Sequence, residues 1–398
     1  MRFISVLPVG NGACSVIRQS RDYRLTGDSD TVSIIDCGNG SGSGKKAAGY
    51  LEAELSSQDW DALQSLVITH WDADHWKGFQ YFAGNTTRPV LKIKRKLVVY
   101  SPAIPLGINP RTQAAILTFI SSTSGSGVEA IDFLASWKKR FDVEFKPVAR
   151  GNTIELAGRP YAVVWPPRNV SGAVADEAAG ILKEIEDLAA DNPLLREALN
   201  KAYSQADGGA FGPFDGEQDG EDYDLSEEFD GRGSNDEDLD AMTDPFDGDD
   251  DANDRLALSR LDGQPSGTPI LKEKDHGSLI KRARHLQNLF SLVFHDSEGQ
   301  SLIVYGDAPE KVVESLIPGL QHWYLVQLAP HHGTHAMPLR APVSRFCVAQ
   351  CSPSQRRAWS KHIRAASVDL AVCDFEPAGI RLPLNFGWHY SFVGRPRS

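Results

Sequence analysis

The stretch Thr69-His70-Trp71-Asp72-Ala73-Asp74-His75 begins at the end of a short, largely apolar run at residues 66–69. Four potential metal ligands, His70, Asp72, Asp74 and His75, stand within six residues. Two imidazoles and two carboxylates are too polar for a core position and denser than an ordinary loop requires. Binding of divalent metal explains both features, with His70 and Asp72 placed for one ion and Asp74 and His75 turned toward a second. The alternative is a solvated turn whose histidines are incidental.

Two further ligand-type stretches follow predicted strands later in the chain. Asp307 comes after a strand predicted at residues 301–305, and His331 and His332 come after one predicted at residues 323–328. Asp307 alone is also explained as a cap for a helix that begins near Pro309. Ligand-type residues at the ends of three distant strands are nevertheless what is expected where strand ends build one site.

The remaining pattern predicts alternating strands and helices. Short β-rich runs separated by Gly and Asn in the first 40 residues indicate an antiparallel meander. Further strands are predicted at 66–69, 96–100, 162–165, 289–295, 301–305 and 323–328, and helices at 47–55, 128–140, 174–203 and 309–316. Such an alternation favours a layered α/β architecture.

The net charge hides two different regions. The 398 residues include 41 Lys+Arg and 53 Asp+Glu, for a net charge of -12. Residues 207–254 hold 20 of the acidic residues and one basic residue, Arg232, so the other 350 residues carry a net charge of +7. The surrounding segment 204–270 is rich in Asp, Glu and Gly, and we predict that it is disordered or loosely ordered. The overall charge therefore does not exclude an anionic substrate.

Composition limits the class of protein. Hydrophobic residues make up 41% and charged residues 24%, as in ordinary globular proteins, which excludes collagen-like and wholly disordered chains. The five cysteines form no C-x-x-C pair, and no run approaches the roughly 20 apolar residues of a membrane span. We therefore expect a cytoplasmic protein with no membrane partner.

With these stretches the sequence resembles the metallo-β-lactamase superfamily, most closely its ComEC-like members associated with DNA uptake. The resemblance covers roughly residues 1–165 and 285–375. The matching stretches are Val9 to Cys14, Ile34 to Gly38, Thr69 to His75, Asn288 to Phe294, Val304 to Ala308 and Leu328 to Thr334. It implies an αββα sandwich, two mixed β-sheets flanked by helices, formed by a single domain over residues 1–398. Within that domain we expect a helical insertion at 175–203 and the acidic low-complexity insertion at 204–270.

The resemblance also implies a ligand set for two divalent metal ions. His70 and Asp72 would hold the first ion, Asp74 and His75 the second, Asp307 would bridge them, and His331 or His332 would complete the second site. Asp72 stands where the superfamily usually has histidine, which favours Mn, Fe or Mg over Zn. Ala13 replaces the aspartate usual in ComEC-like chains. No histidine lies between residues 76 and 160 to complete the first site.

These features predict a metal-dependent hydrolase, and foremost a phosphodiesterase or nuclease in which Asp74 orients the attacking water. The alternatives are a metallohydrolase of small esters, lactones or amides, and a binding or regulatory module that has lost the first metal. Nucleic acid is the expected substrate, and residues 92–96 are a basic run that fits phosphate contacts or the protection of an edge strand. The acidic insertion is expected to bind a protein partner or to occupy the basic cleft as a mimic of nucleic acid.

Overall fold

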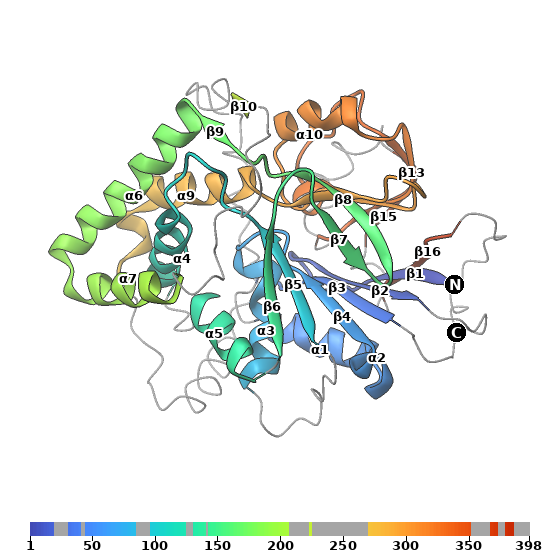
Figure 1. Ribbon diagram of the computed structural model, residues 1–398, viewed down its shortest axis with the longest axis horizontal. Coiled ribbons are helices and arrows are strands. Elements are labelled where there is room, and N and C mark those ends of the chain that lie inside the picture. Colours follow the sequence, from blue (N-terminus) through green and yellow to red (C-terminus); the bar gives the residue numbers. More distant parts are fainter. Residues whose placement is uncertain are drawn as a thin grey trace.

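The computed structural model describes residues 1–19, 31–40, 44–84, 96–124, 130–140, 142–206, 223–224, 270–351, 367–372 and 379–385. Two seven-stranded sheets dominate this part of the chain (Figure 1). The first has the strand order β16 (Ile380–Pro383), β1 (Arg2–Val6), β2 (Cys14–Gln19), β3 (Thr31–Cys37), β4 (Leu63–Val67), β5 (Leu97–Pro102), β6 (Val143–Val148). The second has the order β15 (Ser367–Val372), β14 (Val343–Ala349), β13 (Trp323–Leu328), β12 (Leu302–Val304), β11 (Val293–His295), β8 (Arg159–Trp165), β7 (Thr153–Leu156).

Both sheets are mixed in the same way. In the first, β16, β1, β2 and β3 pair antiparallel, and β3 to β6 pair parallel. In the second, β7, β8, β11 and β12 pair antiparallel, and β12 to β15 pair parallel. Parallel neighbours end at the same edge of a sheet, so β3 and β4 of one sheet and β12 and β13 of the other bring their carboxyl ends to a shared edge.

Helices cover the outer faces of the two sheets. Figure 1 shows α1 (Lys45–Glu54), α2 (Ser57–Asp61) and α3 (Ala73–Gly84) on the first sheet, with α5 (Ala130–Arg140) beside them, and α10 (Glu310–Leu316) on the second. A group of four helices packs together at one end: α4 (Arg111–Ser124), α6 (Ala173–Asp191), α7 (Pro193–Ala206) and α9 (Gly277–Leu289). A small parallel pair, β9 (Val170–Ser171) with β10 (Tyr223–Asp224), lies beyond α6.

The inter-sheet core follows from the alternation of side chains along each strand. In β3, Ile34 faces the helices, whereas its neighbour Ile35 packs between the sheets. In β4, Leu66 and Val67 divide in the same way. Phe294 of β11 and Phe346 of β14 face this layer from the second sheet. Two opposed apolar layers of this kind produce a rigid sandwich, which holds the strand ends in fixed positions.

The predicted architecture is confirmed: the chain is a mixed α/β protein with two mixed sheets flanked by helices, as in the metallo-β-lactamase fold. Two local predictions were wrong. The strand predicted from Leu289 begins only at Val293, because α9 continues to Leu289. Asp74 and His75 lie in the first turn of α3 rather than in a loop. Helices α4 and α9 were not predicted.

The predictions for residues 92–96 and 175–270 lie partly inside and partly outside the described ranges. The predicted helical insertion at 175–203 coincides with α6 and α7, which extend from 173 to 206. Most of the acidic insertion at 204–270 and residues 92–95 of the basic run lie outside the described part of the chain. Its last member, Lys96, precedes β5 and pairs with Glu144 of the edge strand β6, Nζ to Oε2 2.7 Å. Among the described residues, no helix has the length and apolar character needed to cross a membrane.

Candidate metal centre

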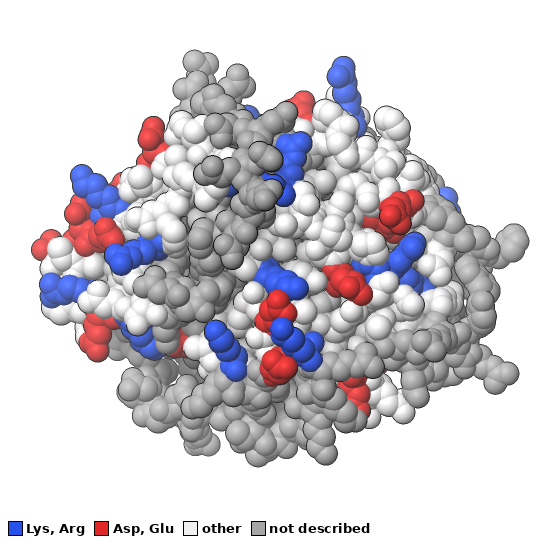
Figure 2. All heavy atoms as spheres, in the orientation of Figure 1, with Lys and Arg blue, Asp and Glu red and all other residues white. Residues whose placement is uncertain are grey.

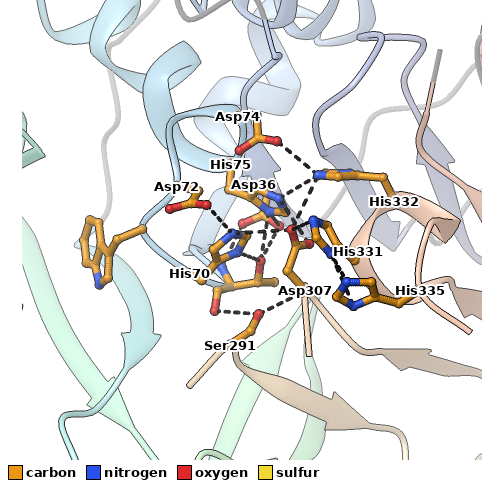
Figure 3. Close-up of polar contacts among 12 residues, drawn as sticks. Asp36, His70, Asp72, Asp74, His75, Ser291, Asp307, His331, His332 and His335 are labelled. Carbon is orange, nitrogen blue, oxygen red and sulfur yellow. Dashed lines mark hydrogen bonds and ion pairs between the residues drawn. The ribbon is translucent and has the colours of Figure 1, made fainter. Parts of the chain in front are cut away.

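The ends of strands from both sheets bring the predicted ligands together. His70 follows β4, Asp307 follows β12, and His331 follows β13, each three residues beyond the last residue of the strand. Backbone hydrogen bonds join these ends: the Leu292 N–H donates to the Thr69 carbonyl at 2.7 Å, and the His331 N–H donates to the Gly306 carbonyl at 2.9 Å. Figure 3 shows the resulting cluster of aspartates and histidines.

One half of the cluster centres on His332. Its Nε2 lies 3.1 Å from Asp74 Oδ2 and 3.1 Å from His75 Nε2. His75 Nε2 in turn lies 3.3 Å from Asp307 Oδ1. The side chains of Asp74, His75 and His332 form a group whose ligand atoms all lie within 4.8 Å of one another, as ligands of one ion must.

The other half centres on His70. Its Nε2 lies 3.6 Å from Asp307 Oδ2 and 3.8 Å from Asp72 Oδ2. The same Asp307 oxygen is 3.6 Å from His331 Nε2 and 3.7 Å from His332 Nε2. Asp307 therefore lies between the two halves, and all seven predicted ligands converge on one place.

Asp36 contacts Nδ1 of His75, the ring nitrogen that faces away from the cluster. This role was not predicted from the sequence. Its Oδ2 lies 2.9 Å from His75 Nδ1 and accepts a hydrogen bond from the Thr69 hydroxyl at 2.7 Å, while its Oδ1 accepts from the Thr69 N–H at 2.8 Å. A carboxylate on Nδ1 fixes the imidazole orientation and leaves Nε2 toward the cluster. The sequence signal is an aspartate near the end of β3, two residues before Gly38. In the structure Asp36 has a φ of 55°, which is uncommon for a residue other than glycine.

His335 supports His331 in a comparable way and was also missed. His331 Nδ1 lies 2.5 Å from His335 Nε2, so the Nε2 of His331 remains turned toward Asp307. Both His331 and His332 have left-handed backbone conformations, with φ of 47° and 57°. The Thr334 hydroxyl donates to the His331 carbonyl at 2.6 Å and stabilises this turn. Such strained residues cluster at functional sites, because the surrounding structure must hold them in place.

Ser291 and Gly306 hold the loop that carries Asp307. The Ser291 hydroxyl accepts a hydrogen bond from the Asp307 N–H at 2.8 Å. A Cβ on Gly306 would lie 2.3 Å from that hydroxyl oxygen, and the φ of Gly306 is 54°. A glycine is therefore required here for close approach as well as for backbone conformation.

In the half of the cluster around His332, histidines and aspartates shift one another's pKa values as paired opposite charges do. Burial opposes charge on His75, but Asp307, Asp36 and Asp74 raise its pKa well above the usual value. Burial likewise opposes charge on His332, whose pKa is raised by Asp307 and by the hydrogen bond to Asp74. The same histidines lower the pKa of Asp74 and of Asp307, against the effect of burial. The aspartates and histidines of this half therefore stabilise one another's charged forms.

In the His70 half, burial dominates instead. It lowers the pKa of His70 to about 3, an effect reinforced by His75. It raises the pKa of Asp72 to about 7, with a further contribution from Asp74. Burial also lowers the pKa of His331, and with His331 it lowers the pKa of His335 to about 3. Neutral imidazoles are the form that binds a metal ion.

The residues present fit divalent metal ions. His70 Nε2 is buried and has no hydrogen-bond partner within the described part of the chain, where buried Asp307 Oδ1 also forms no hydrogen bond, although it lies 3.3 Å from His75 Nε2 in an ion pair. Unpaired buried groups are costly, and a cation would satisfy both. The donors are imidazole nitrogens and carboxylate oxygens, which suit Zn, Mn and Fe.

Comparison with known proteins agrees with this geometry. Residues 8–173 match the model of the Metallo-beta-lactamase superfamily. This part of the chain is a metallo-beta-lactamase superfamily domain. The matched region includes Asp36 and the loop from His70 to His75, and the structure adds Asp307, His331 and His332 from the second sheet. A search of the curated proteins found no match. The superfamily consists mostly of hydrolytic enzymes, which supports a metal-dependent hydrolase.

Proposed function

We propose that this protein is a metal-dependent phosphodiesterase, and specifically a nuclease, whose reaction centre is the cluster around Asp307. The observation that carries the proposal is the position of Asp307, with carboxylate oxygens 3.6 Å from His70 Nε2 and 3.3 Å from His75 Nε2. A carboxylate between two groups of ligands is suited to bridge two cations. Paired divalent ions are a recurrent arrangement for phosphodiester hydrolysis.

In this proposal Asp74, His75 and His332 would hold one ion, His70 and Asp72 would hold the other, and Asp307 would contribute to both. His331 Nε2 also faces Asp307 and is placed to supply a nitrogen that the region between residues 76 and 160 lacks. Bound divalent ions supply Lewis acidity, which activates water and neutralises charge developing on the phosphoryl group. Asp74, whose pKa is lowered by His75 and His332, stays ionised and would orient that water.

An anionic substrate is supported by charge near the site. Arg284 of α9 lies close enough to Asp72 for its charge to oppose the rise in the pKa of that carboxyl. Figure 2 shows described side chains of both signs mixed over one face of the molecule, so this face offers no large basic patch. The case for a phosphodiester therefore depends on the centre itself, together with the +7 charge of the chain outside residues 207–254.

The test is a substrate panel on the purified full-length protein, stripped of metal and reloaded separately with Mn, Zn or Fe. The panel contains bis(p-nitrophenyl) phosphate, single- and double-stranded DNA, RNA, cyclic dinucleotides, and p-nitrophenyl esters and lactones. We expect metal-dependent cleavage of phosphodiesters. Asp74→Asn should reduce it by about 10²–10⁴-fold, whereas Asp132→Asn, which changes an aspartate paired with Lys201 on the surface, should leave it unchanged.

Other outcomes would replace the proposal. Turnover of esters or lactones with no phosphodiester cleavage would identify a small-molecule metallohydrolase. Metal binding without turnover of any substrate would favour a binding or regulatory module.

A further inference from the structure

Two cysteine side chains face each other beside the ligand loop. Cys14, the first residue of β2, pairs with Cys37, the last residue of β3, across the antiparallel ladder between these strands. Both residues are free thiols and fully buried, and the Cys14 thiol forms a hydrogen bond with the Cys37 thiol. Neither thiol is among the described side chains that could hold a metal ion, so the metal centre assigns them no role.

The register of this pair suits a disulfide. The Gly38 N–H donates to the Ala13 carbonyl at 3.0 Å, so the next pair along the ladder, Cys14 and Cys37, is of the non-hydrogen-bonded type. The Cα atoms of such pairs lie about 4.5 Å apart, which brings their side chains close together. Disulfides usually join Cα atoms that lie about 4.4–6.8 Å apart. A bond between these two sulfurs therefore requires only a small movement of the backbone.

Cys37 contacts the structure that holds His75. It follows Asp36, whose Oδ2 lies 2.9 Å from His75 Nδ1. Its Sγ also lies against α3, the helix whose first turn carries Asp74 and His75, because a Cβ on Gly78 would be 2.4 Å from that sulfur. A displacement of the sulfur would therefore move Asp36, the helix or both.

Cys14 is joined to the ligand loop through the residue before it. The Ala13 N–H donates to the Asp74 carbonyl at 3.0 Å. Across the ladder, a Cβ on Gly38 would be 2.2 Å from the carbonyl carbon of Asp74, so the backbone of the ligand loop lies directly against the end of β3. Contacts this close leave no free space, and a change in the spacing of the two strand ends would move the backbone of Asp74.

We propose that Cys14 and Cys37 form an oxidative modification site, at which hydrogen peroxide converts the two thiols to a disulfide that displaces the ligand loop and weakens metal binding. One thiolate attacks a peroxide oxygen, the O–O bond breaks, and a sulfenic acid and water form. The second thiol attacks the sulfenic sulfur, the S–S bond forms, and the hydroxyl group leaves as water. Two thiols thus lose two electrons and two protons, and one peroxide becomes two waters.

The buried position makes this oxidation slow. Burial and the Cys37 thiol raise the pKa of Cys14, so the less reactive protonated thiol prevails while the fold is closed. Residues 7–13, which precede Cys14, belong to no helix or strand, and such segments open locally more readily than core strands. Hydrogen peroxide is little larger than water and can enter through openings of this kind. The pair therefore responds to sustained rather than brief exposure to the oxidant.

The test measures the disulfide and the metal affinity separately. Metal-free, full-length protein is treated with hydrogen peroxide until its free-thiol content is constant, alkylated in denaturant and analysed by peptide mass spectrometry. We expect a cross-link between Cys14 and Cys37. The dissociation constant for Zn, measured by calorimetry, should be about 10–100-fold higher than that of the reduced protein, the loss typical when the support of metal ligands is disturbed. Dithiothreitol should restore the affinity.

Substitutions of single thiols separate the disulfide from other oxidative damage. Cys14→Ala and Cys37→Ala should each keep their Zn affinity after the same treatment. Cys347→Ala, which removes a buried thiol of β14, is the matched control and should respond as the wild type does. Thermal unfolding of the reduced variants checks that each is folded, and reversal by dithiothreitol tests the wild type without any substitution.

The proposal rests on the metal binding of the proposed function and not on its substrate. A wild type that forms no cross-link between the two cysteines, or one whose cross-linked form keeps its Zn affinity, would overturn the proposal and leave the metal centre standing. An equal loss of affinity in Cys14→Ala and Cys37→Ala would overturn it as well. Reduced wild type that binds no Zn would contradict the metal centre itself.

Discussion

Two groups of charged residues lie near opposite ends of β2, and they are built differently. At the Arg18 end, Arg18 Nη1 lies 2.6 Å from Glu54 Oε1, Arg18 Nε lies 3.4 Å from Asp59 Oδ1, and Arg381 Nη2 lies 3.0 Å from Glu54. Two cations thus meet two anions. Near the Cys14 end, where the Ala13 N–H donates to the Asp74 carbonyl, the metal centre brings together three aspartates and four histidines and leaves buried atoms unpaired.

Charged side chains stabilise the fold in the Arg18 group, whereas those of the metal centre are arranged to bind a ligand. The Arg18 group also includes a complete capping box, in which Ser56 and Asp59 cap α2 with reciprocal hydrogen bonds. The metal centre instead contains unpaired atoms and left-handed histidines, features that reduce stability and persist where a function requires them. We therefore expect substitutions at the Arg18 end to change stability, and substitutions in the centre to change activity and metal affinity.

The largest expected effect is on catalysis. Asp74→Asn should reduce kcat/KM for phosphodiester cleavage by about 10²–10⁴-fold, because the variant lacks a carboxylate ligand of the centre and the group that orients the water. The free energy of unfolding of the metal-free protein should fall by no more than about 1 kcal/mol. Steady-state kinetics and urea unfolding of the same preparation check both. A large loss of stability with activity retained would remove the distinction between the two regions.

The reverse pattern is expected for Arg18→Met. Removal of the guanidinium leaves Glu54 without its main partner in a largely buried position, at a cost of about 3 kcal/mol in the free energy of unfolding. Activity and metal content at a temperature where the protein is folded should match the wild type. Arg381→Met is the control, because its side chain is 44% exposed and such pairs contribute about 0–1 kcal/mol. Equal losses in the two variants would contradict the account.

Asp36→Asn should separate metal affinity from folding. The amide keeps the shape of the carboxylate but no longer holds His75 Nδ1 with a negative charge, and loss of such support typically weakens metal binding by about 10–100-fold. Calorimetric titration with Zn or Mn checks this. Unchanged affinity would show that Asp36 only supports the loop through Thr69.

The smallest effect is on acid stability. Burial raises the pKa of Glu54, but Arg18 and its other partners outweigh this effect and lower the pKa below its usual 4.5. Since the folded state holds this proton less tightly than the unfolded state, the stabilisation is present above about pH 4.5 and is lost as the pH falls through the folded pKa. Urea midpoints between pH 3 and 6 should therefore fall less steeply for Glu54→Gln than for the wild type. An unchanged slope would assign acid sensitivity to other carboxylates.

Local patterns predicted a layered α/β protein and the ligand stretches, whereas the two-sheet sandwich was implied by the resemblance to the metallo-β-lactamase superfamily. Strand periodicity, the dense loop from His70 to His75, and the aspartate and histidine pair after later strands are all visible in the chain. The supporting residues were not predicted. Asp36 acts from a left-handed backbone conformation, and His335 acts through its contact with the left-handed His331. Such roles arise from tertiary packing, which single-sequence patterns do not encode.

The central claim is that the cluster around Asp307 holds divalent metal, and metal content tests it most directly. The full-length protein is loaded with Mn or Zn, desalted, and analysed by inductively coupled plasma mass spectrometry beside Asp307→Asn. We predict about two ions per wild-type chain, as in paired-metal hydrolytic sites, and fewer than one in the variant. A wild type that retains no metal, or a variant that retains as much as the wild type, would contradict the account.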